Sequence, residues 1–386
     1  MSQPQRIYLS PPDYRQQPLP ASEQLSDIAW LEGRAAAFES ALAVRLPGTH
    51  VAALSSGTAA IHLALILAGV GEGDTVLCQS MTFSASANPI LYLKAVPVFI
   101  DSEPSSWNMD PELLEKAIKT ELNKGRKPKA IIPVHIYGMP ANMTAITSLA
   151  STYEIPVIED AAEALGAVYN HKPCGSLGDI GVLSFNSNKI ITTSGGGALT
   201  SCNEAIVRKA RFLASQARDM APYYQHSEVG YNYRMGNVNA AIGEGQLAMM
   251  AIRVQARRSN YQTYYQALAD LPGISFQHEA DTSVSNRWLT AILIDPQKSG
   301  GVTTDQVRKA LKTQQIESRP LWKPMHMQPV FSTCPAYVNG VAGGLFSQGL
   351  CLPSGSALSE ADLQRIIAAI RSSWEMVRRP SAVSHH

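Results

Sequence analysis

The chain reads Ser184-Phe-Asn-Ser-Asn-Lys189-Ile-Ile-Thr-Thr-Ser-Gly-Gly-Gly197 near its middle, and Lys189 is the single charged residue of that stretch. A lysine amine in a desolvated pocket has a lowered pKa and can attack a carbonyl to form a Schiff base. The stretch therefore makes Lys189 a candidate for the lysine that binds pyridoxal phosphate (PLP). The alternative is a strand-end lysine beside a flexible turn. Residues elsewhere in the chain that could bind the other groups of PLP distinguish the two interpretations.

The composition is that of a globular protein. The chain has 386 residues, 45% of them hydrophobic and 16% charged, with a formal net charge of +1. This length suggests about two domains, and the even charge, without a long basic or acidic block, predicts no nucleic-acid partner and no anionic membrane surface. The N-terminus lacks an apolar signal segment and no window reaches membrane-spanning length. We therefore expect a soluble, cytoplasmic protein.

The five cysteines are scattered and never form a C-x-x-C pair. This usage predicts reduced thiols rather than a disulfide framework or a zinc site. His171 and Cys174 are close in sequence, but no second pair accompanies them. We therefore interpret them as loop residues and predict no metal.

Short β-branched runs alternate with helical patterns through the first part of the chain. The expected strands are 51–54, 75–78, 96–100, 130–134 and 157–158, and the expected helices are 59–68, 84–94, 111–122 and 143–152. Strands separated by helices predict a mostly parallel sheet that is covered on both faces. Ligands of such sheets bind beyond the carboxyl ends of the strands.

A different pattern follows. A long helical region at 235–268 precedes expected strands at 288–294 and 316–319 and expected helices at 304–314 and 360–377. This mixture indicates a smaller α+β unit. We therefore divide the chain into a large α/β domain with an N-terminal arm, residues 1–250, and a small C-terminal domain, residues 251–386.

Two further signals suit a PLP site. Gly57 and Thr58 stand where a strand passes into a helix, so their backbone amides can bind a phosphate. Asp160 ends a buried apolar strand, where a carboxylate needs a positive partner such as a pyridinium nitrogen. An ordinary helix N-cap is the alternative in both places.

These segments, in this order, resemble the DegT/StrS family of PLP-dependent sugar-nucleotide aminotransferases. The matching segments are Ser55-Ser-Gly-Thr-Ala-Ala60, Thr82-Phe83, Glu159-Asp160-Ala-Ala-Glu163, Ser184-Phe-Asn-Ser-Asn-Lys189 and Gly230-Tyr-Asn232-Tyr-Arg234-Met. The resemblance implies a fold-type I, aspartate aminotransferase-like α/β architecture with a mostly parallel central sheet.

Three C-terminal segments carry a narrower resemblance. They are Ser285-Asn-Arg-Trp288, Glu317-Ser-Arg319-Pro-Leu-Trp322-Lys-Pro-Met-His326 and Cys351-Leu-Pro-Ser354-Gly355. With the stretch after Lys189, they look most like the 4-aminotransferases of UDP-N-acetylbacillosamine synthesis.

The resemblance implies a role for each residue around the ring of the cofactor. Lys189 would form the Schiff base, Asp160 would pair with the pyridinium nitrogen, and Glu163 would face the ring hydroxyl. Phe83 would stack on the ring, although a core phenylalanine is the alternative. Asn186 stands where many relatives have a histidine, which leaves Lys189 as the only evident base.

By the same resemblance, the phosphate of PLP would be held by Gly57, Thr58 and Ser184. Asn232 would reach that phosphate from the neighbouring subunit, which implies a homodimer with shared active sites.

Trp288, Arg319 and His326 are the candidates for contacts with the amino acceptor. An arginine can hold a diphosphate or a carboxylate through two parallel hydrogen bonds. The alternatives are a surface salt bridge for Arg319 and an ordinary loop histidine for His326.

The reaction implied is a ping-pong transamination. L-Glutamate would convert PLP to pyridoxamine phosphate (PMP), which would then aminate a UDP-linked 4-keto-6-deoxy-N-acetylhexosamine to a UDP-4-amino-4,6-dideoxy sugar. A 3-aminotransferase acting on a dTDP-keto sugar and a PLP-binding regulator without turnover remain as alternatives. A PLP-dependent sugar 3-dehydratase is disfavoured by Lys189, because the related dehydratases have histidine in its place.

Overall fold

The structure is a computed structural model that describes residues 5–15 and 20–378. Its centre is a large sheet in two four-stranded parts, ordered β14–β3–β2–β4 and β5–β8–β9–β1. Bridges between Ile131 and Val157 and between Val134 and Asp160 join the parts between β4 and β5. The strands are β1 (His50–Leu54), β2 (Thr75–Gln79), β3 (Val96–Ile100), β4 (Ala130–Ile132), β5 (Ile158–Asp160), β8 (Ile180–Ser184), β9 (Gly197–Ser201) and β14 (Ala336–Tyr337).

The strand directions confirm a mostly parallel sheet. β14, β3, β2 and β4 pair in parallel, as do β5 and β8. Among the paired strands of this sheet, β9 alone runs antiparallel to its neighbours β8 and β1. The carboxyl ends of the parallel strands therefore lie at one edge.

Helices cover both faces of this sheet because its strands alternate side chains between two cores. In β1, Ala52 and Leu54 join one core, whereas Val51 and Ala53 join the other. The first face packs against α4 (Gly57–Leu67), α5 (Asn88–Tyr92) and α8 (Glu204–Ala214). The second packs against α3 (Arg34–Arg45), α6 (Pro111–Asn123), α7 (Met143–Tyr153) and α9 (Asn237–Ala248).

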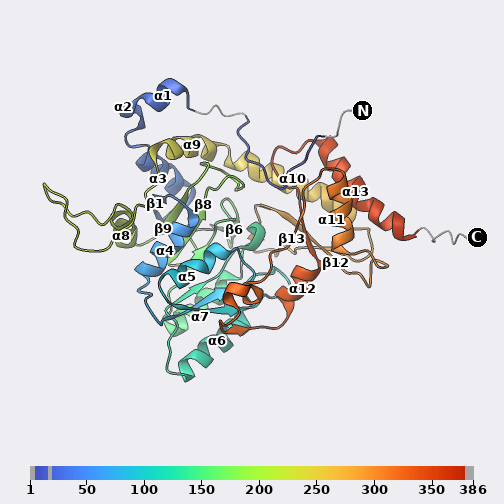
Figure 1. Ribbon diagram of the computed structural model, residues 1–386, viewed down its shortest axis with the longest axis horizontal. Helices are drawn as coiled ribbons and strands as arrows, with labels where there is room; N and C mark the ends of the chain where they lie inside the picture. Colours follow the sequence, from blue (N-terminus) through green and yellow to red (C-terminus); the bar gives the residue numbers. More distant parts are fainter. Residues whose placement is uncertain (1–4, 16–19, 379–386) are drawn as a thin grey trace, which may run out of the picture.

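A second, antiparallel sheet has the order β10–β12–β15–β13. Its strands are β10 (Ile274–Phe276), β12 (Thr290–Ile294), β15 (Gly349–Leu352) and β13 (Arg319–Pro320). It shares a core with α10 (Met250–Leu268), α11 (Thr304–Thr313) and α13 (Glu360–Arg378), all toward the right of Figure 1. Ile7 of the N-terminal arm bridges to Ile316 and belongs to this core. The proposed division at residue 250 therefore remains a prediction, with the arm packed on the C-terminal side.

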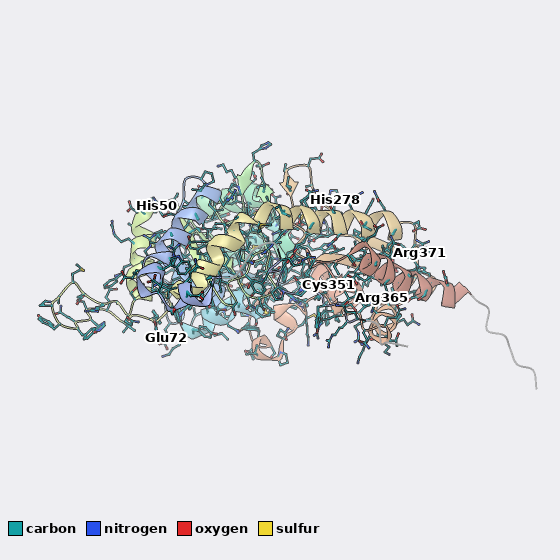
Figure 2. All side chains as sticks on the ribbon, turned by 90° about the horizontal axis from the view of Figure 1, so that it is seen from above. His50, Glu72, His278, Cys351, Arg365 and Arg371 are labelled. Atoms are coloured by element: carbon teal, nitrogen blue, oxygen red, sulfur yellow. The ribbon has the colours of Figure 1, made fainter. Side chains whose placement is uncertain are left out.

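The view in Figure 2 sets the two ends of the molecule apart. His50, at the start of β1, lies at the end opposite Arg371 on α13, and α10 runs between these ends. Cys351, on β15, is labelled toward the middle. The interior between the two sheets is thus where residues from both parts of the chain can meet.

The remaining elements are short. They are α1 (Ser22–Ser26), α2 (Ile28–Leu31), α12 (Val341–Gln348), the small sheet of β11 (Ser283–Val284), β6 (Val168–Tyr169) and β7 (Lys172–Pro173), and the 3-10 turns η1 (Ser84–Ser86), η2 (Ile136–Gly138), η3 (Met325–Met327) and η4 (Pro329–Phe331). The segment between α8 and α9 includes a long loop that projects from the body at the left of Figure 1. Among the described helices, none has both the length and the apolar character needed to cross a membrane.

Several expected elements differ in the structure. The expected helix at 84–94 is instead η1 followed by α5, in which Pro89 stands in the first turn, where a missing N–H costs no helical hydrogen bond. The expected helix at 235–268 is two helices, α9 and α10, that meet at Met249. β8 and β9, the strands on either side of Lys189, were not among the expected strands.

Candidate active site

A cavity of about 620 Å³ opens beyond the carboxyl ends of the parallel strands, and the second sheet and the N-terminal arm supply its other walls. The residues predicted from the sequence that line it are Gly57, Thr58, Phe83, Asp160, Glu163, Ser184, Lys189, Trp288 and Arg319. Residues far apart in the chain therefore meet where the topology predicts a ligand.

The N-terminus of α4 forms one end of the cavity. Ser56 is its N-cap, and its side chain accepts a hydrogen bond from the amide of Ala59 at 3.0 Å. The amides of Gly57 and Thr58 belong to the first turn, where the helix itself supplies no acceptor. A Cβ on Gly197 would lie 2.4 Å from the carbonyl carbon of Ser56, so the last of the three glycines lets β9 approach this turn. The result is an anion site at a helix N-terminus.

Asp160 is the last residue of β5 and is 4% exposed. Its Oδ2 accepts a hydrogen bond from the Ser86 hydroxyl at 2.6 Å, and its Oδ1 accepts one from the Ala162 amide at 3.1 Å. Burial raises the pKa of Asp160, and these two hydrogen bonds oppose the rise. A carboxylate this deeply buried is stabilised by a cation in the cavity, and a protonated ring nitrogen is such a cation.

Glu163 and Lys189 form a buried pair. Glu163 Oε1 lies 3.4 Å from Lys189 Nζ, and Glu163 Oε2 accepts a hydrogen bond from the amide of Tyr137 at 2.8 Å. Burial raises the pKa of the Glu163 carboxyl to about 7, while the charge of Lys189 opposes the rise. The sequence left Lys189 as the only evident base, and the structure adds a second titratable group beside it.

The Trp288 ring packs against the amine of Lys189. Lys189 Nζ lies 4.2 Å from the centroid of the Trp288 ring, within the range of a cation–π contact. The indole Nε1 of Trp288 donates a hydrogen bond to the carbonyl of Asn188 at 2.7 Å. Trp288, predicted as a substrate contact, therefore also holds the backbone next to the lysine.

Phe83 is an aromatic side chain on the cavity wall. It is 58% exposed, which rules out the alternative of a core phenylalanine. Its ring centroid lies 5.5 Å from that of Trp322, which in turn lies 6.1 Å from that of Trp288. A planar ligand in the cavity would find an open aromatic face here.

Arg319 stands at the rim of the cavity with 68% of its side chain exposed. It pairs with Glu317 at 2.9 Å, and the other oxygen of Glu317 accepts a hydrogen bond from the Leu9 amide at 3.1 Å. The salt bridge considered from the sequence is therefore present, in a position that also faces the cavity.

Two predicted residues do not line the cavity of this chain. His326 Nδ1 lies 2.6 Å from the Ser80 hydroxyl in a half-buried position, and burial lowers the pKa of His326. Asn232 is exposed on the segment between α8 and α9, where it accepts a hydrogen bond from Gln216 at 3.1 Å. A contact between Asn232 and a phosphate would have to be made in a second subunit.

The structure also shows residues that the sequence analysis missed. Tyr137 has a φ of 55°, an unusual left-handed conformation for a bulky residue, and this conformation accompanies the hydrogen bond of its amide to Glu163. Ser86 lies within the expected helix 84–94, so no feature of the sequence indicated its hydrogen bond to Asp160. Trp322 did have a signal, because it belongs to the quoted segment that contains Arg319.

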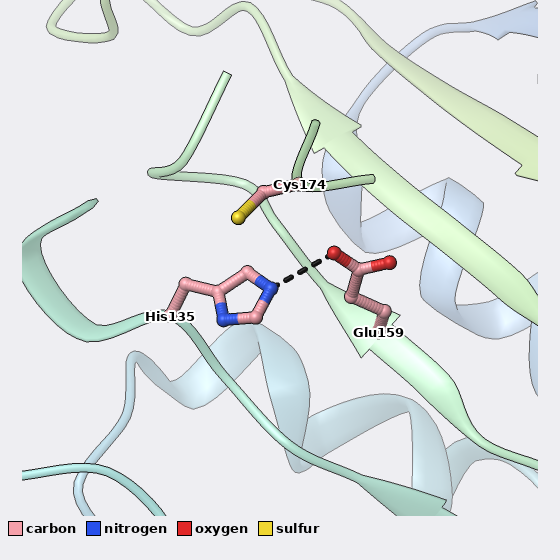
Figure 3. Close-up of side chains that lie close together, drawn as sticks. All are labelled: His135, Glu159 and Cys174. Carbon is pink, nitrogen blue, oxygen red and sulfur yellow. Dashed lines mark hydrogen bonds and ion pairs between the residues drawn. The ribbon is translucent and has the colours of Figure 1, made fainter. Parts of the chain in front are cut away.

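A buried cluster next to the site holds His135, Glu159 and Cys174 (Figure 3). His135 Nε2 donates to Glu159 at 2.8 Å, and His135 Nδ1 accepts the Ala141 amide at 3.0 Å. Glu159 also accepts backbone hydrogen bonds from Gly175, Leu177 and Gly178 at 2.5, 2.7 and 3.1 Å.

These contacts decide what the cluster does. The imidazole and carboxylate lone pairs already point at N–H groups, so the cluster fits a hydrogen-bonded link between β5 and the 174–178 loop rather than a metal centre. Cys174, interpreted from the sequence as a loop residue near His171, is in fact fully buried against this link, whereas His171 is exposed.

A strand-end carboxylate, an amine and a helix N-terminus on one mostly parallel sheet define a PLP-dependent enzyme of fold type I. The donor set fits PLP, because it offers amides for a phosphate, a carboxylate for a protonated ring nitrogen and an amine for an aldehyde. The comparisons with known proteins agree with this class and refine it.

The chain belongs to the DegT/DnrJ/EryC1/StrS aminotransferase family, whose profile it matches over residues 21–371. EpsN from Bacillus subtilis, provisionally named as a PLP-dependent aminotransferase, is 49% identical over 372 residues, which cover 95% of each chain. GDP-perosamine synthase from Caulobacter vibrioides is 40% identical over 334 residues, which cover 86% of this chain and 88% of that one. A DegT DnrJ EryC1 StrS aminotransferase structure from Brucella abortus has a TM-score of 0.82 at 31% identity, covering 88% of this chain and 90% of the other.

These findings confirm the predictions of fold class, enzyme class and cofactor. The protein is a PLP-dependent sugar aminotransferase of fold type I. A regulator without turnover is thereby set aside.

Proposed function

We propose that the protein transfers the amino group of L-glutamate to C4 of a UDP-linked 4-keto-6-deoxy-N-acetylhexosamine, giving a UDP-4-amino-4,6-dideoxy sugar of the bacillosamine type. One observation carries this proposal. The C-terminal segments that resemble the UDP-bacillosamine 4-aminotransferases supply Trp288, Arg319, Trp322 and Cys351 to the cavity that contains Lys189. The resemblance thus lies in residues that would meet the sugar.

PLP would be held by the residues that line the cavity at the carboxyl ends of the parallel strands. The amides of Gly57 and Thr58 and the hydroxyl of Ser184 would bind the phosphate, and the Phe83 ring would pack on the cofactor. The carboxylate of Asp160 would keep the ring nitrogen protonated. When bound, PLP supplies the electron sink that makes the α-proton of an amino acid acidic.

Lys189 and Glu163 would handle the protons. The Lys189 amine, once released from PLP, would act as the general base and acid that moves a proton within the bound substrate. Glu163 Oε1, 3.4 Å from Lys189 Nζ, would take or return a proton as the charge of the lysine changes. A Glu163 pKa of about 7, raised by burial, suits that exchange near neutral pH.

The second candidate acceptor is a GDP-linked keto sugar. The 40% identity to a GDP-perosamine synthase supports this choice of nucleotide. A GDP-linked acceptor would leave the roles of Asp160, Glu163 and Lys189 unchanged, because the two acceptors would differ in the part of the substrate that is far from the amino group.

We also propose that the protein acts as a homodimer, with Asn232 completing the active site of a second copy. The loop that carries this residue projects from the body and exposes Met220, Tyr224 and Val229. Burying these side chains against a partner would stabilise the assembly. A cytoplasmic location remains a prediction of the sequence.

The acceptor is best tested with a panel. The purified holoenzyme would be incubated with L-glutamate and UDP-, GDP- and dTDP-linked 3- and 4-keto sugars, and each amino product would be identified by mass spectrometry and NMR. We expect the largest kcat/KM with the UDP-linked 4-keto-6-deoxy-N-acetylhexosamine. Preference for a GDP-linked 4-keto sugar would establish the second candidate, and success only with a 3-keto sugar would overturn both.

A further inference from the structure

A second pocket, of about 430 Å³, shares a wall with the cavity. It is called the basic pocket below and is defined by four cationic side chains: Arg6, Arg308, Lys312 and Arg319. Glu317 and Arg319 line both the basic pocket and the cavity. A ligand that spans the two spaces would therefore lie against Arg319.

The charge of the basic pocket is strongly positive. Its lining holds one carboxylate, Glu317, which is already engaged by Arg319 at 2.9 Å and by the Leu9 amide at 3.1 Å. Asp305 pairs with Arg308 at 2.6 Å, but it also pairs with Lys309 at 2.6 Å and does not line the pocket. The positive charge of the lining thus exceeds its negative charge, which favours an anion.

The backbone brings these cations together from three elements. Arg308 and Lys312 are four residues apart on α11 and so project from the same face of the helix. Arg6 comes from the N-terminal arm, which is held beside Ile316 by the bridge from Ile7, and Arg319 comes from β13. Ser318 adds a hydroxyl oxygen that is buried and has no hydrogen-bond partner in the described part of the chain.

We propose that the basic pocket binds the diphosphate of the nucleotide-sugar substrate while the sugar occupies the cavity. This inference rests on the proposed function, because it assigns the anionic part of the same acceptor. The cavity of about 620 Å³ would contain the cofactor and the hexose, and Arg319 is the cationic residue that borders both the cavity and the basic pocket. Arginine binds phosphate oxygens through paired, charge-assisted hydrogen bonds, and lysine adds a further positive charge.

The test compares variants on one face of α11 with a control on another. Arg308→Ala/Lys312→Ala should raise the KM for the nucleotide sugar about 10- to 100-fold, the loss expected for hydrogen bonds to charged groups. The conversion of PLP to PMP by L-glutamate should keep its rate, because glutamate carries no diphosphate. Lys309, next to Arg308, does not line the pocket. Lys309→Ala should therefore leave the KM for the nucleotide sugar and the rate of the glutamate half-reaction unchanged.

A binding measurement separates this inference from the proposed function. UDP and GDP titrated calorimetrically into the holoenzyme should bind more weakly to the double variant than to wild type or Lys309→Ala, and more weakly as NaCl rises. Equal binding by the double variant would overturn the inference and leave the aminotransferase assignment intact. Inorganic phosphate that competes as well as UDP would also overturn it, by showing a site for phosphate alone. Failure of every nucleotide sugar as a substrate would instead overturn the proposed function, whatever the binding result.

Discussion

In the interior of the cavity Asp160 and Glu163 are each 4% exposed, whereas at its rim 68% of the Arg319 side chain is exposed. We call these the buried wall (Asp160, Glu163 and Lys189) and the open wall (Glu317 and Arg319). A buried charge is costly unless it is paired, so the buried wall can serve only a ligand of fixed chemistry. The exposed Arg319 guanidinium on the open wall keeps much of its hydration and can adapt to substrates that vary. Buried charges would thus recognise PLP, whereas exposed charges would select the substrate.

The largest difference between the walls is expected at Lys189. Lys189→Ala should remove the visible absorption of the Schiff base with PLP and lower kcat by ~10³-fold or more, because the base and the covalent attachment are both lost. Absorption spectra and steady-state rates of the purified variant provide the check. Lys94→Ala, at a lysine whose side chain is 72% exposed, serves as the control and should match wild type. Retained absorption and turnover in Lys189→Ala would refute the role of the buried wall.

Asp160 should give the next largest effect. Asp160→Asn keeps the shape but removes the charge that holds a ring nitrogen protonated, so kcat should fall by ~10²- to 10³-fold, a loss typical of removing one preorganised electrostatic contact. Ser86→Ala removes one hydrogen bond to Asp160 and leaves the carboxylate, so its loss should be smaller. Steady-state rates of both variants would be measured with L-glutamate and the nucleotide-sugar acceptor. If Ser86→Ala were as damaging as Asp160→Asn, the carboxylate charge would not be the decisive feature.

Glu163 tests the buried wall through pH. Burial raises its pKa from 4.5 to about 7, so the folded protein binds the proton more tightly than the unfolded chain does. That contribution to stability is complete below pH 4.5 and is lost as pH rises through 7. Glu163→Gln cannot lose it, so the Tm of the apo variant relative to wild type should increase between pH 5 and pH 7.5.

The measurement is thermal unfolding of both apo proteins across that range. Both proteins contain the groups that interact electrostatically with Glu163, which are Asp160, Lys189, Tyr137 and Cys351. The difference in Tm therefore reports on the Glu163 carboxyl. A difference that stays constant with pH would show that Glu163 titrates as an ordinary surface carboxyl does.

Arg319 should give the smallest effect on the protein itself. Its pair with Glu317 is exposed, so Arg319→Ala should change the free energy of unfolding by no more than ~1 kcal/mol. The KM for the nucleotide sugar should nevertheless rise about tenfold, while the half-reaction with L-glutamate keeps its rate. Denaturant titration and the two kinetic assays together give the answer. A slower glutamate half-reaction would assign Arg319 to the amino donor and weaken the contrast between the walls.

Asp160, Lys189 and the phosphate turn at Gly57 and Thr58 could be predicted from the sequence because each has a local signal. Asp160 follows an apolar strand, Gly57 and Thr58 open an apolar helix, and Lys189 stands apart from other charges. Strand–helix alternation then implies that strand ends share one edge of a sheet, so three local features become one site. β8 and β9 escaped prediction even though they flank Lys189.

The sequence by itself determined the fold class and the cofactor, because its motifs stand in the order of a known family. The residues that would bind PLP remain predictions from that resemblance. Only the tertiary structure decided that Glu163 lies 3.4 Å from Lys189, that His326 turns to Ser80, and that Arg6 meets Arg308 and Lys312 in the basic pocket. These outcomes depend on how the two sheets and the N-terminal arm pack against one another. Burial and the distances between residues far apart in the sequence decide how strongly these charged groups interact. Neither can be read from a local stretch of sequence.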